Sequence, residues 1–292
     1  MTAALPLMVI VGPTASGKTS LAIDLAKKYG GEIICADSRT IYRGLDIGTA
    51  KPMSVEQDGI PHWGLDLVEP GQRFTAADFK DYAVEKIAEI RHRGYVPFLV
   101  GGTGLYINSV VYDYIFPPEV NTLERNKYNN MSFDMLYKYC AENNIKLPEN
   151  DKNKRYVINA ILRKGREALR RSEPLENTYI VGIASEKSEL SERIERRARE
   201  IWANGVIDEA KKAARKHGWD NAAMTGNIYP IIRDVLDGRT SRIEAIERFA
   251  VLDRRLAKRQ LTWFKRDSNI VWLPRDEAYT YCAHILDRLN KL

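Results

Sequence analysis

Residues 12–19 read Gly12-Pro13-Thr14-Ala15-Ser16-Gly17-Lys18-Thr19, which matches the phosphate-loop pattern G-x-x-x-x-G-K-[ST]. In this pattern the glycines let successive backbone N–H groups point at one anion. The lysine adds a positive charge, and the hydroxyl of Thr19 is the expected Mg²⁺ contact. An apolar run over 7–11 precedes the loop, and apolar residues at helical spacing follow it over 18–28. The order strand, glycine loop, helix predicts a phosphate-binding site of the kind found in nucleotide-binding and ATP-binding proteins.

Further apolar runs alternate with helical patterns along the rest of the chain. We expect strands at 32–36, 96–100, 179–184 and 269–273, and helices at 75–94, 107–111, 188–201, 241–265 and 277–289. Thr75 and Asp78 have the spacing of a capping box at the start of the first of these helices. Alternation of buried strands with helices is typical of a parallel sheet. The sequence therefore predicts an α/β fold, a P-loop NTPase-like core whose parallel sheet is flanked by helices.

The segment 119–171 differs from its surroundings, because it is polar, rich in Asn and Lys, and without a clear strand. Its apolar residues have helical spacing, at Phe133, Leu136, Tyr137 and Cys140 and more loosely over 156–162. We interpret it as a small all-helical insertion domain. The catalytic core would then comprise 1–118 and 172–292.

Composition sets broad limits on the class of protein. The 292 residues carry 45 Lys and Arg against 39 Asp and Glu, a net charge of +6 that favours a polyanionic partner without proving one. The cysteines are odd in number, far apart and without metal-ligand spacing, which is typical of reduced thiols in a cytoplasmic protein. No apolar run is long enough to cross a membrane, so we expect no membrane partner.

Polar residues follow two further strands of the expected sheet. Asp37 comes directly after the strand at 32–36, and the second glycine turn Gly101-Gly102-Thr103-Gly104 follows the strand at 96–100. Ligands of parallel sheets bind at the carboxyl ends of the strands, so Asp37, Thr103 and Lys18 should lie close together. An acid after the strand at 96–100, typical of motor-type ATPases and GTPases, is absent, whereas a small-molecule kinase stays open. Two glycine turns at one edge favour a diphosphate held from both sides.

Two helical patterns carry cations. Arg197 falls on the apolar face set by Leu190, Ile194 and Ile201, where it requires either a bound anion or a structural salt bridge. The pattern at 241–265 has an apolar stripe of Phe249, Leu252, Leu256 and Trp263. Its other faces carry Arg254, Arg255, Lys258, Arg259, Lys265 and Arg266. These cations indicate contact with a phosphate backbone, with an ordinary solvated helix as the alternative.

Several separated motifs together are similar to the tRNA dimethylallyltransferase (tRNA isopentenyltransferase) family. They are the phosphate loop, Asp37-Ser38-Arg39, the segment Tyr42-Arg43-Gly44-Leu45-Asp46-Ile47-Gly48-Thr49-Ala50-Lys51-Pro52, the second glycine turn with Leu105-Tyr106, and Lys258-Arg259-Gln260-Leu261-Thr262-Trp263-Phe264. The resemblance implies transfer of a dimethylallyl group from dimethylallyl diphosphate to N6 of adenosine 37, next to the tRNA anticodon, with release of diphosphate.

The resemblance also implies roles for individual residues. Asp37 would accept a hydrogen bond or a proton from the adenine amine, while Lys18, Thr103 and Arg197 would contact the diphosphate; Asp37, Thr103 and Arg197 are the implied catalytic residues. Contacts with the substrate and tRNA would come from Ser38, Arg39, Lys51, Lys258, Arg259 and Gln260. The remaining phosphate-loop residues Gly12, Thr14, Ala15, Ser16 and Gly17 would bind the diphosphate with Mg²⁺ on Thr19. The insertion domain would contact the anticodon stem–loop, and the protein is expected to be a monomer.

The chain departs from the family pattern in two places. It has Ile228-Tyr229-Pro230-Ile231 where members have Gly-Tyr followed by a basic residue and Glu, and Asn159-Ala160-Ile161-Leu162 where they have Arg-Ala-Leu-Glu. Besides the small-molecule kinase, two alternatives to the tRNA prenyltransferase interpretation remain at this point. One is an isopentenyltransferase that acts on free AMP, ADP or ATP, and the other is a tRNA-binding relative with reduced activity.

Overall fold

The computed structural model describes residues 5–117, 122–165 and 169–289. The chain divides into two compact units, one formed by Met1–Val111 with Pro174–Leu292 and the other by Tyr112–Glu173. The expected boundary at 118/119 lies outside the described residues.

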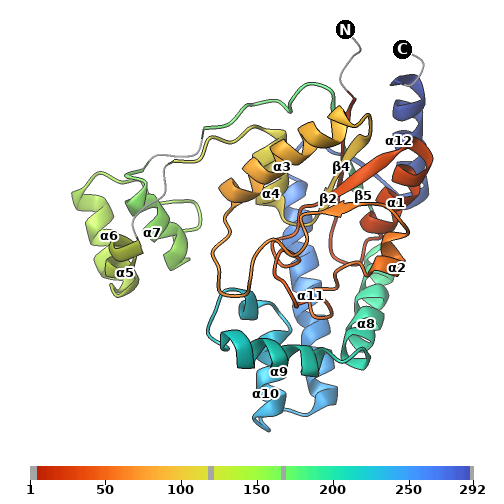
Figure 1. The fold of residues 1–292 in the computed structure, drawn as a ribbon. Coiled ribbons are helices and arrows are strands. Elements are labelled where there is room, and N and C mark those ends of the chain that lie inside the picture. The colour runs from red at the N-terminus through yellow and green to blue at the C-terminus, as the bar shows by residue number, and fades with distance from the viewer. Residues whose placement is uncertain (1–4, 118–121, 166–168, 290–292) are drawn as a thin grey trace. The chain divides into compact units, whose positions relative to one another are not determined.

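A parallel sheet of six strands forms the centre of the larger unit (Figure 1). The strands are β1 (Leu7–Val11), β2 (Gly31–Cys35), β3 (His62–Trp63), β4 (Val96–Gly101), β5 (Thr178–Ile183) and β6 (Val271–Leu273), in the order β3-β2-β4-β1-β5-β6. All neighbouring strands are parallel, and β1, β2 and β4 are buried along their whole length. This confirms the predicted fold class. The short β3 and the helix α2 (Ser54–Gln57) lie between β2 and residue 75, where no strand or helix is predicted from the sequence.

Helices cover both faces of this sheet. On one face α1 (Lys18–Tyr29) and α12 (Arg275–Leu289) pack on alternate residues of β1, β4 and β5. Elsewhere α3 (Ala76–His92) packs on α4 (Gly104–Val111), where the rings of Phe79 and Tyr106 stack with centroids 4.1 Å apart. Thr75 and Asp78 form the predicted capping box at the start of α3.

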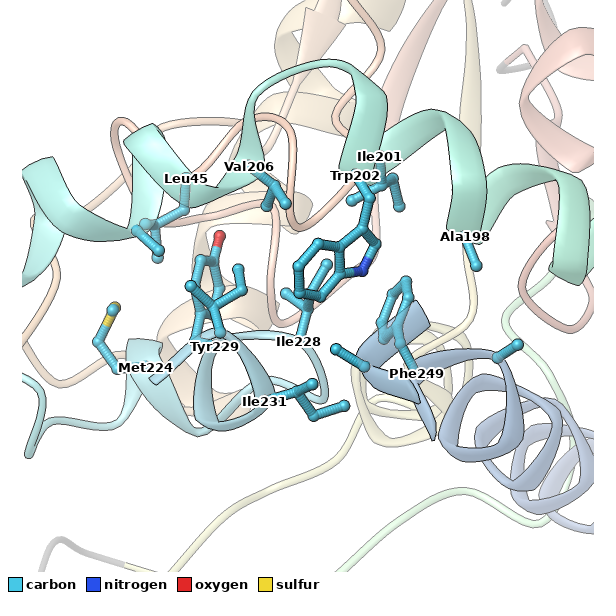
Figure 2. Close-up of a cluster of buried hydrophobic side chains, with 14 of the residues drawn as sticks. Leu45, Ala198, Ile201, Trp202, Val206, Met224, Ile228, Tyr229, Ile231 and Phe249 are labelled. Atoms are coloured by element: carbon cyan, nitrogen blue, oxygen red, sulfur yellow. The ribbon is translucent and has the colours of Figure 1, made fainter. Parts of the chain in front are cut away.

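A second hydrophobic cluster packs four further helices around the segment after β2. The helices are α8 (Lys187–Ala203), α9 (Val206–His217), α10 (Tyr229–Leu236) and α11 (Arg242–Phe264), with a 3-10 turn η1 at Ala223–Thr225. Figure 2 shows Trp202 and Tyr229 at its centre, with Phe249 of α11 beside Trp202. The unusual Ile228–Ile231 segment is therefore part of a packed core, since Ile228, Tyr229 and Ile231 are almost fully buried.

The buried face of α11 differs from the predicted apolar stripe. Phe249 is buried as expected, but Leu252 and Leu256 are half-buried and Trp263 is 38% exposed. The buried face consists of Phe249 together with Ala245, Ala250, Asp253, Ala257 and Phe264. Small residues on this face permit close packing against α8, and that contact decides which face of α11 is buried.

The smaller unit contains α5 (Thr122–Asn129), α6 (Phe133–Glu142) and α7 (Lys154–Leu162) around its own core. The core residues are Tyr128, Leu136, Cys140, Val157, Ile158 and Ile161. Ile115 and Leu169 form an antiparallel bridge within the unit. The predicted helical patterns near 133–140 and 156–162 are confirmed as α6 and α7, whereas α5 had not been expected.

Glu209 of α9 anchors the segment that follows β2. Its carboxylate accepts hydrogen bonds from the backbone N–H groups of Asp46, Ile47 and Gly48 at 2.6–2.9 Å. The hydroxyl of Tyr229 donates to the same carboxylate at 3.0 Å, and burial raises the pKa of this tyrosine. One side chain thus satisfies three donors of a segment that lacks regular secondary structure and one donor of α10.

We predict that Glu209→Ala lowers the free energy of unfolding by about 2–3 kcal/mol, because it leaves partly buried donors without an acceptor. Urea denaturation measures this loss. Glu247→Ala, which removes an exposed carboxylate from α11, is the control and should change stability by no more than about 0.5 kcal/mol. Equal stability of the two variants would contradict the anchoring role.

Candidate functional site

The phosphate loop connects β1 to α1 and turns its backbone through two left-handed residues. Ala15 has φ of 60° and Gly17, which caps α1, has φ of 87°. Gly12 has little room for a side chain, since an added Cβ would lie 2.7 Å from the Ser16 hydroxyl oxygen. That hydroxyl is buried and has no hydrogen-bond partner among the described residues. A bound anion at the start of α1 would meet both an unused polar group and the positive end of the helix.

Lys18 lies in the same loop and is close to charges from two other elements. Its ammonium donates to the carbonyl of Pro13 at 3.1 Å. Burial lowers the pKa of Lys18 to about 8, with Asp37 opposing the shift and Arg197 adding to it. Lys18 of the phosphate loop is therefore within electrostatic reach of Asp37, at the end of β2, and of Arg197, on α8. The proximity of Lys18 and Asp37 agrees with the sequence prediction.

The loops after β2 and β4 are joined by hydrogen bonds around Thr103. Its N–H donates to the carbonyl of Ala36 at 3.2 Å, and its hydroxyl oxygen accepts the N–H of Ser38 at 3.0 Å. Asp37 lies between these contacts, where its carboxylate accepts the N–H of Arg39 at 2.8 Å. Gly101 makes the approach possible, because an added Cβ there would lie 2.1 Å from the Ala36 carbonyl oxygen.

Arg197 reaches the phosphate loop from the buried side of α8. Its guanidinium donates to the hydroxyl of Thr14, while its Nε is buried without a partner in the described part of the chain. Among the described residues no carboxylate forms an ion pair with Arg197. Of the two sequence interpretations, the contacts favour a bound anion over a structural salt bridge.

Sequence reasoning missed Asp253 of α11, which belongs to the same region. Asp253 is 6% exposed, and its carboxylate accepts a hydrogen bond from Asn227 at 3.0 Å. Burial raises its pKa, and Arg197 opposes the shift. Asp253 directly precedes the cations of 254–266, and a single acid in a helix carries no further signal in the sequence.

The residues predicted to contact the substrate or tRNA have different surroundings. Arg39 donates to the carbonyl of Ala222 and to the Thr225 hydroxyl, so it links the Asp37 loop to η1. Lys51 is 7% exposed, and its ammonium contacts the Tyr42 carbonyl, Asp46 and Asp66, each at 2.6 Å. These contacts use all three N–H groups of Lys51 within the protein and leave none for RNA.

Gln260 and the cations beside it divide between two sides of α11. The Gln260 amide contacts both glycine turns, whereas Lys258 and Arg259 are exposed. Within the described ranges, Arg255, Lys258, Arg259, Lys265 and Arg266 form no ion pair, although Arg254 pairs with Glu195 at 2.8 Å. The exposed basic surface expected from the sequence is present, with Arg254 partly neutralised.

Thr19, the predicted Mg²⁺ contact, is half-buried in the first turn of α1. No group of three or more His, Cys, Asp or Glu residues in the described chain is arranged to hold a metal ion. A Mg²⁺ ion held by one hydroxyl and the phosphate oxygens of a substrate needs no such group, so the residues present fit this mode of binding. None of the described helices is both long and apolar enough to span a membrane.

The parallel sheet, the phosphate loop and the adjoining second glycine turn define an α/β protein with a P-loop NTPase-like fold. Residues 40–267 match the family model described as IPP transferase. The chain is 37% identical to a tRNA dimethylallyltransferase of Macrococcus caseolyticus, over 94% of this chain and 92% of that protein. For the tRNA dimethylallyltransferase of Bacillus subtilis the identity is 35%, over 97% and 98%.

A solved structure gives the same result. The full-length tRNA isopentenylpyrophosphate transferase of Bacillus halodurans superposes with a TM-score of 0.75 at 35% identity, covering 98% of each chain. The chain therefore belongs to the tRNA dimethylallyltransferase family. The resemblance predicted from its motifs is confirmed.

The lowered pKa of Lys18 predicts a pH dependence of anion binding. Lys18 is charged below its pKa of about 8 and neutral above it, so the dissociation constant of inorganic diphosphate should rise by up to about tenfold per pH unit above that value. Isothermal titration calorimetry measures this rise. Lys18→Arg is the control, since its guanidinium stays charged and the titration of the diphosphate itself is the same. Identical pH profiles would contradict the assignment.

Proposed function

We propose that this protein transfers a dimethylallyl group from dimethylallyl diphosphate to N6 of adenosine 37 in tRNA and releases diphosphate. The convergence of the Asp37 carboxylate with the phosphate loop, Thr103 and Arg197 at one edge of the sheet carries this proposal. A carboxylate beside a diphosphate site suits attack on carbon, because it supplies a proton acceptor next to a leaving group that needs positive charge.

The reaction would use these groups in distinct roles. The N6 nitrogen forms a bond to C1 of the allyl group as the C1–O bond breaks, and the bonding electrons leave with the diphosphate. Lys18 and Arg197 stabilise the charge that develops there, together with the N–H groups of the phosphate loop. Asp37 accepts the proton that N6 loses. Its carboxylate is oriented for this by the N–H of Arg39.

Mg²⁺ bound through the Thr19 hydroxyl would neutralise part of the diphosphate charge. The Thr103 hydroxyl would contact the diphosphate from the other turn, at a position fixed by its bond with the Ser38 N–H. Ser38 and Arg39 border the Asp37 carboxylate, and we assign them to the acceptor side of the site.

We assign tRNA binding to exposed Lys258 and Arg259 of α11 and to the helical unit Tyr112–Glu173. A base stacked in an RNA loop cannot present its amine to a buried carbon, so adenosine 37 would have to leave the stack to reach Asp37. The exposed, unpaired cations of α11 provide the phosphate contacts that such a complex requires.

Incubation of the protein with labelled dimethylallyl diphosphate, Mg²⁺, tRNA and a mixture of AMP, ADP and ATP should place the label on adenosine 37, as read by mass spectrometry of nuclease digests. Asp37→Asn is the matched variant, and its single-turnover rate should fall by about a hundredfold or more while tRNA still binds. Label only in AMP, ADP or ATP would favour the free-nucleotide alternative. Tight tRNA binding with no turnover in the natural protein would favour the binding-protein alternative.

The α11 surface makes a separate prediction about RNA affinity. Lys258→Gln with Arg259→Gln should weaken tRNA binding and reduce the slope of log affinity against log salt by about 1–2, because fewer counterions are released. Filter binding over a range of salt concentrations measures the slope. Lys27→Gln is the control, because Lys27 is an exposed cation of α1 that forms an ion pair with Asp58. An unchanged slope in the double variant would remove α11 from the RNA surface.

A further inference from the structure

We propose that Gln260 is a positioning residue that fixes the separation of the two glycine turns, and with it the width of the diphosphate site. This inference rests on the proposed function, because it assigns the site between these turns to the diphosphate. It gives Gln260 a different role from the substrate or tRNA contact expected from the sequence.

The amide of Gln260 joins the two turns directly. Its Oε1 accepts the N–H of Thr14 in the phosphate loop at 2.8 Å, and its Nε2 donates to the carbonyl of Gly102 at 3.1 Å. One turn therefore requires an acceptor and the other a donor, and a primary amide supplies both at one position. A carboxylate lacks the donor, and an apolar side chain of the same length lacks both.

The second glycine turn is packed so closely that this bridge has little freedom. A Cβ added at Gly102 would lie 2.3 Å from Nε2 of Gln260 and 3.4 Å from the carbonyl oxygen of Gly12. One helical turn further along α11, Trp263 lies against Gly104, where an added Cβ would be 2.2 Å from the indole. Gln260 and Trp263 of α11 thus both contact the second turn, and Gln260 holds it against the phosphate loop.

The bridge also extends to Arg197. The Thr14 N–H is occupied by Gln260, and the Thr14 hydroxyl accepts from the guanidinium of Arg197. Thr14 therefore connects α11 with α8, and its backbone position influences where the guanidinium lies. Loss of the Gln260 contact would release Thr14 and Gly102 together, so that the groups on either side of the diphosphate would no longer be held in register.

Two variants separate positioning from RNA contact. Gln260→Met keeps the length of the side chain and removes both hydrogen bonds. Gln260→Glu keeps the acceptor for Thr14 but sets a carboxylate against the Gly102 carbonyl. Gln57→Glu is the control, because Gln57 also donates through Nε2 to a backbone carbonyl, that of Pro52 at 2.9 Å, outside the proposed site.

Both Gln260 variants should bind inorganic diphosphate with Mg²⁺ at least about tenfold more weakly than the natural protein, and kcat/KM for dimethylallyl diphosphate should fall at least as far. Their dissociation constants for tRNA should stay within about twofold, and Gln57→Glu should match the natural protein in both measurements. Unchanged diphosphate binding in Gln260→Met, with or without weaker tRNA binding, would overturn the proposal. Diphosphate binding is measured without tRNA, so failure of this proposal is distinct from failure of the natural protein to prenylate tRNA.

Discussion

The site depends on three backbone turns that approach one another more closely than side chains would permit. Pairing of β4 with both β1 and β2 brings the phosphate loop, the Asp37 loop and the second glycine turn to one edge of the sheet. Gly101 lies against the Ala36 carbonyl, so a side chain there would force the second turn away from the end of β2, and a side chain at Gly102 would collide with the Gln260 amide that joins the turns. The glycines of the second turn are therefore required by packing and not by local conformation, since none of Gly101, Gly102 and Gly104 has a positive φ.

This close packing buries charge that only an anion can fully compensate. Desolvation lowers the pKa of Lys18. The charge of Arg197 lowers it further, whereas the charge of Asp37 raises it. The Ser16 hydroxyl and Nε of Arg197 are buried without a partner among the described residues, which costs free energy in the unliganded protein. A diphosphate with Mg²⁺ would supply acceptors for these donors, so part of the cost of building the site is recovered when the substrate binds.

Local patterns in the sequence predicted the sheet, the main helices of the core and the meeting of Lys18 with Asp37. They succeed because the carboxyl ends of parallel strands lie at one edge of the sheet. Residues that follow two such strands are therefore brought together whatever their individual contacts are. Gln260 bonds to Thr14, which lies 246 positions away in the sequence, and to Gly102, which lies 158 positions away. No local sequence pattern can predict such contacts. The contacts of Lys51 with Asp46 and Asp66 are hidden from the sequence for a related reason, since these acids surround it only after the loop has folded.

The helix α11 shows why the apolar pattern alone misplaced a face. Leucines at 252 and 256 suggested a stripe, yet the buried positions include Ala245, Ala250 and Ala257, which let α11 approach α8, and Asp253, which faces the site. Arg259 and Gln260 are consecutive, but one is exposed to solvent and the other bonds the glycine turns. A single rigid helix thereby carries the proposed RNA surface and sets the dimensions of the donor site. Under this proposal one helix would set both the position of bound RNA and that of the diphosphate, which would favour attack of a base on a bound donor.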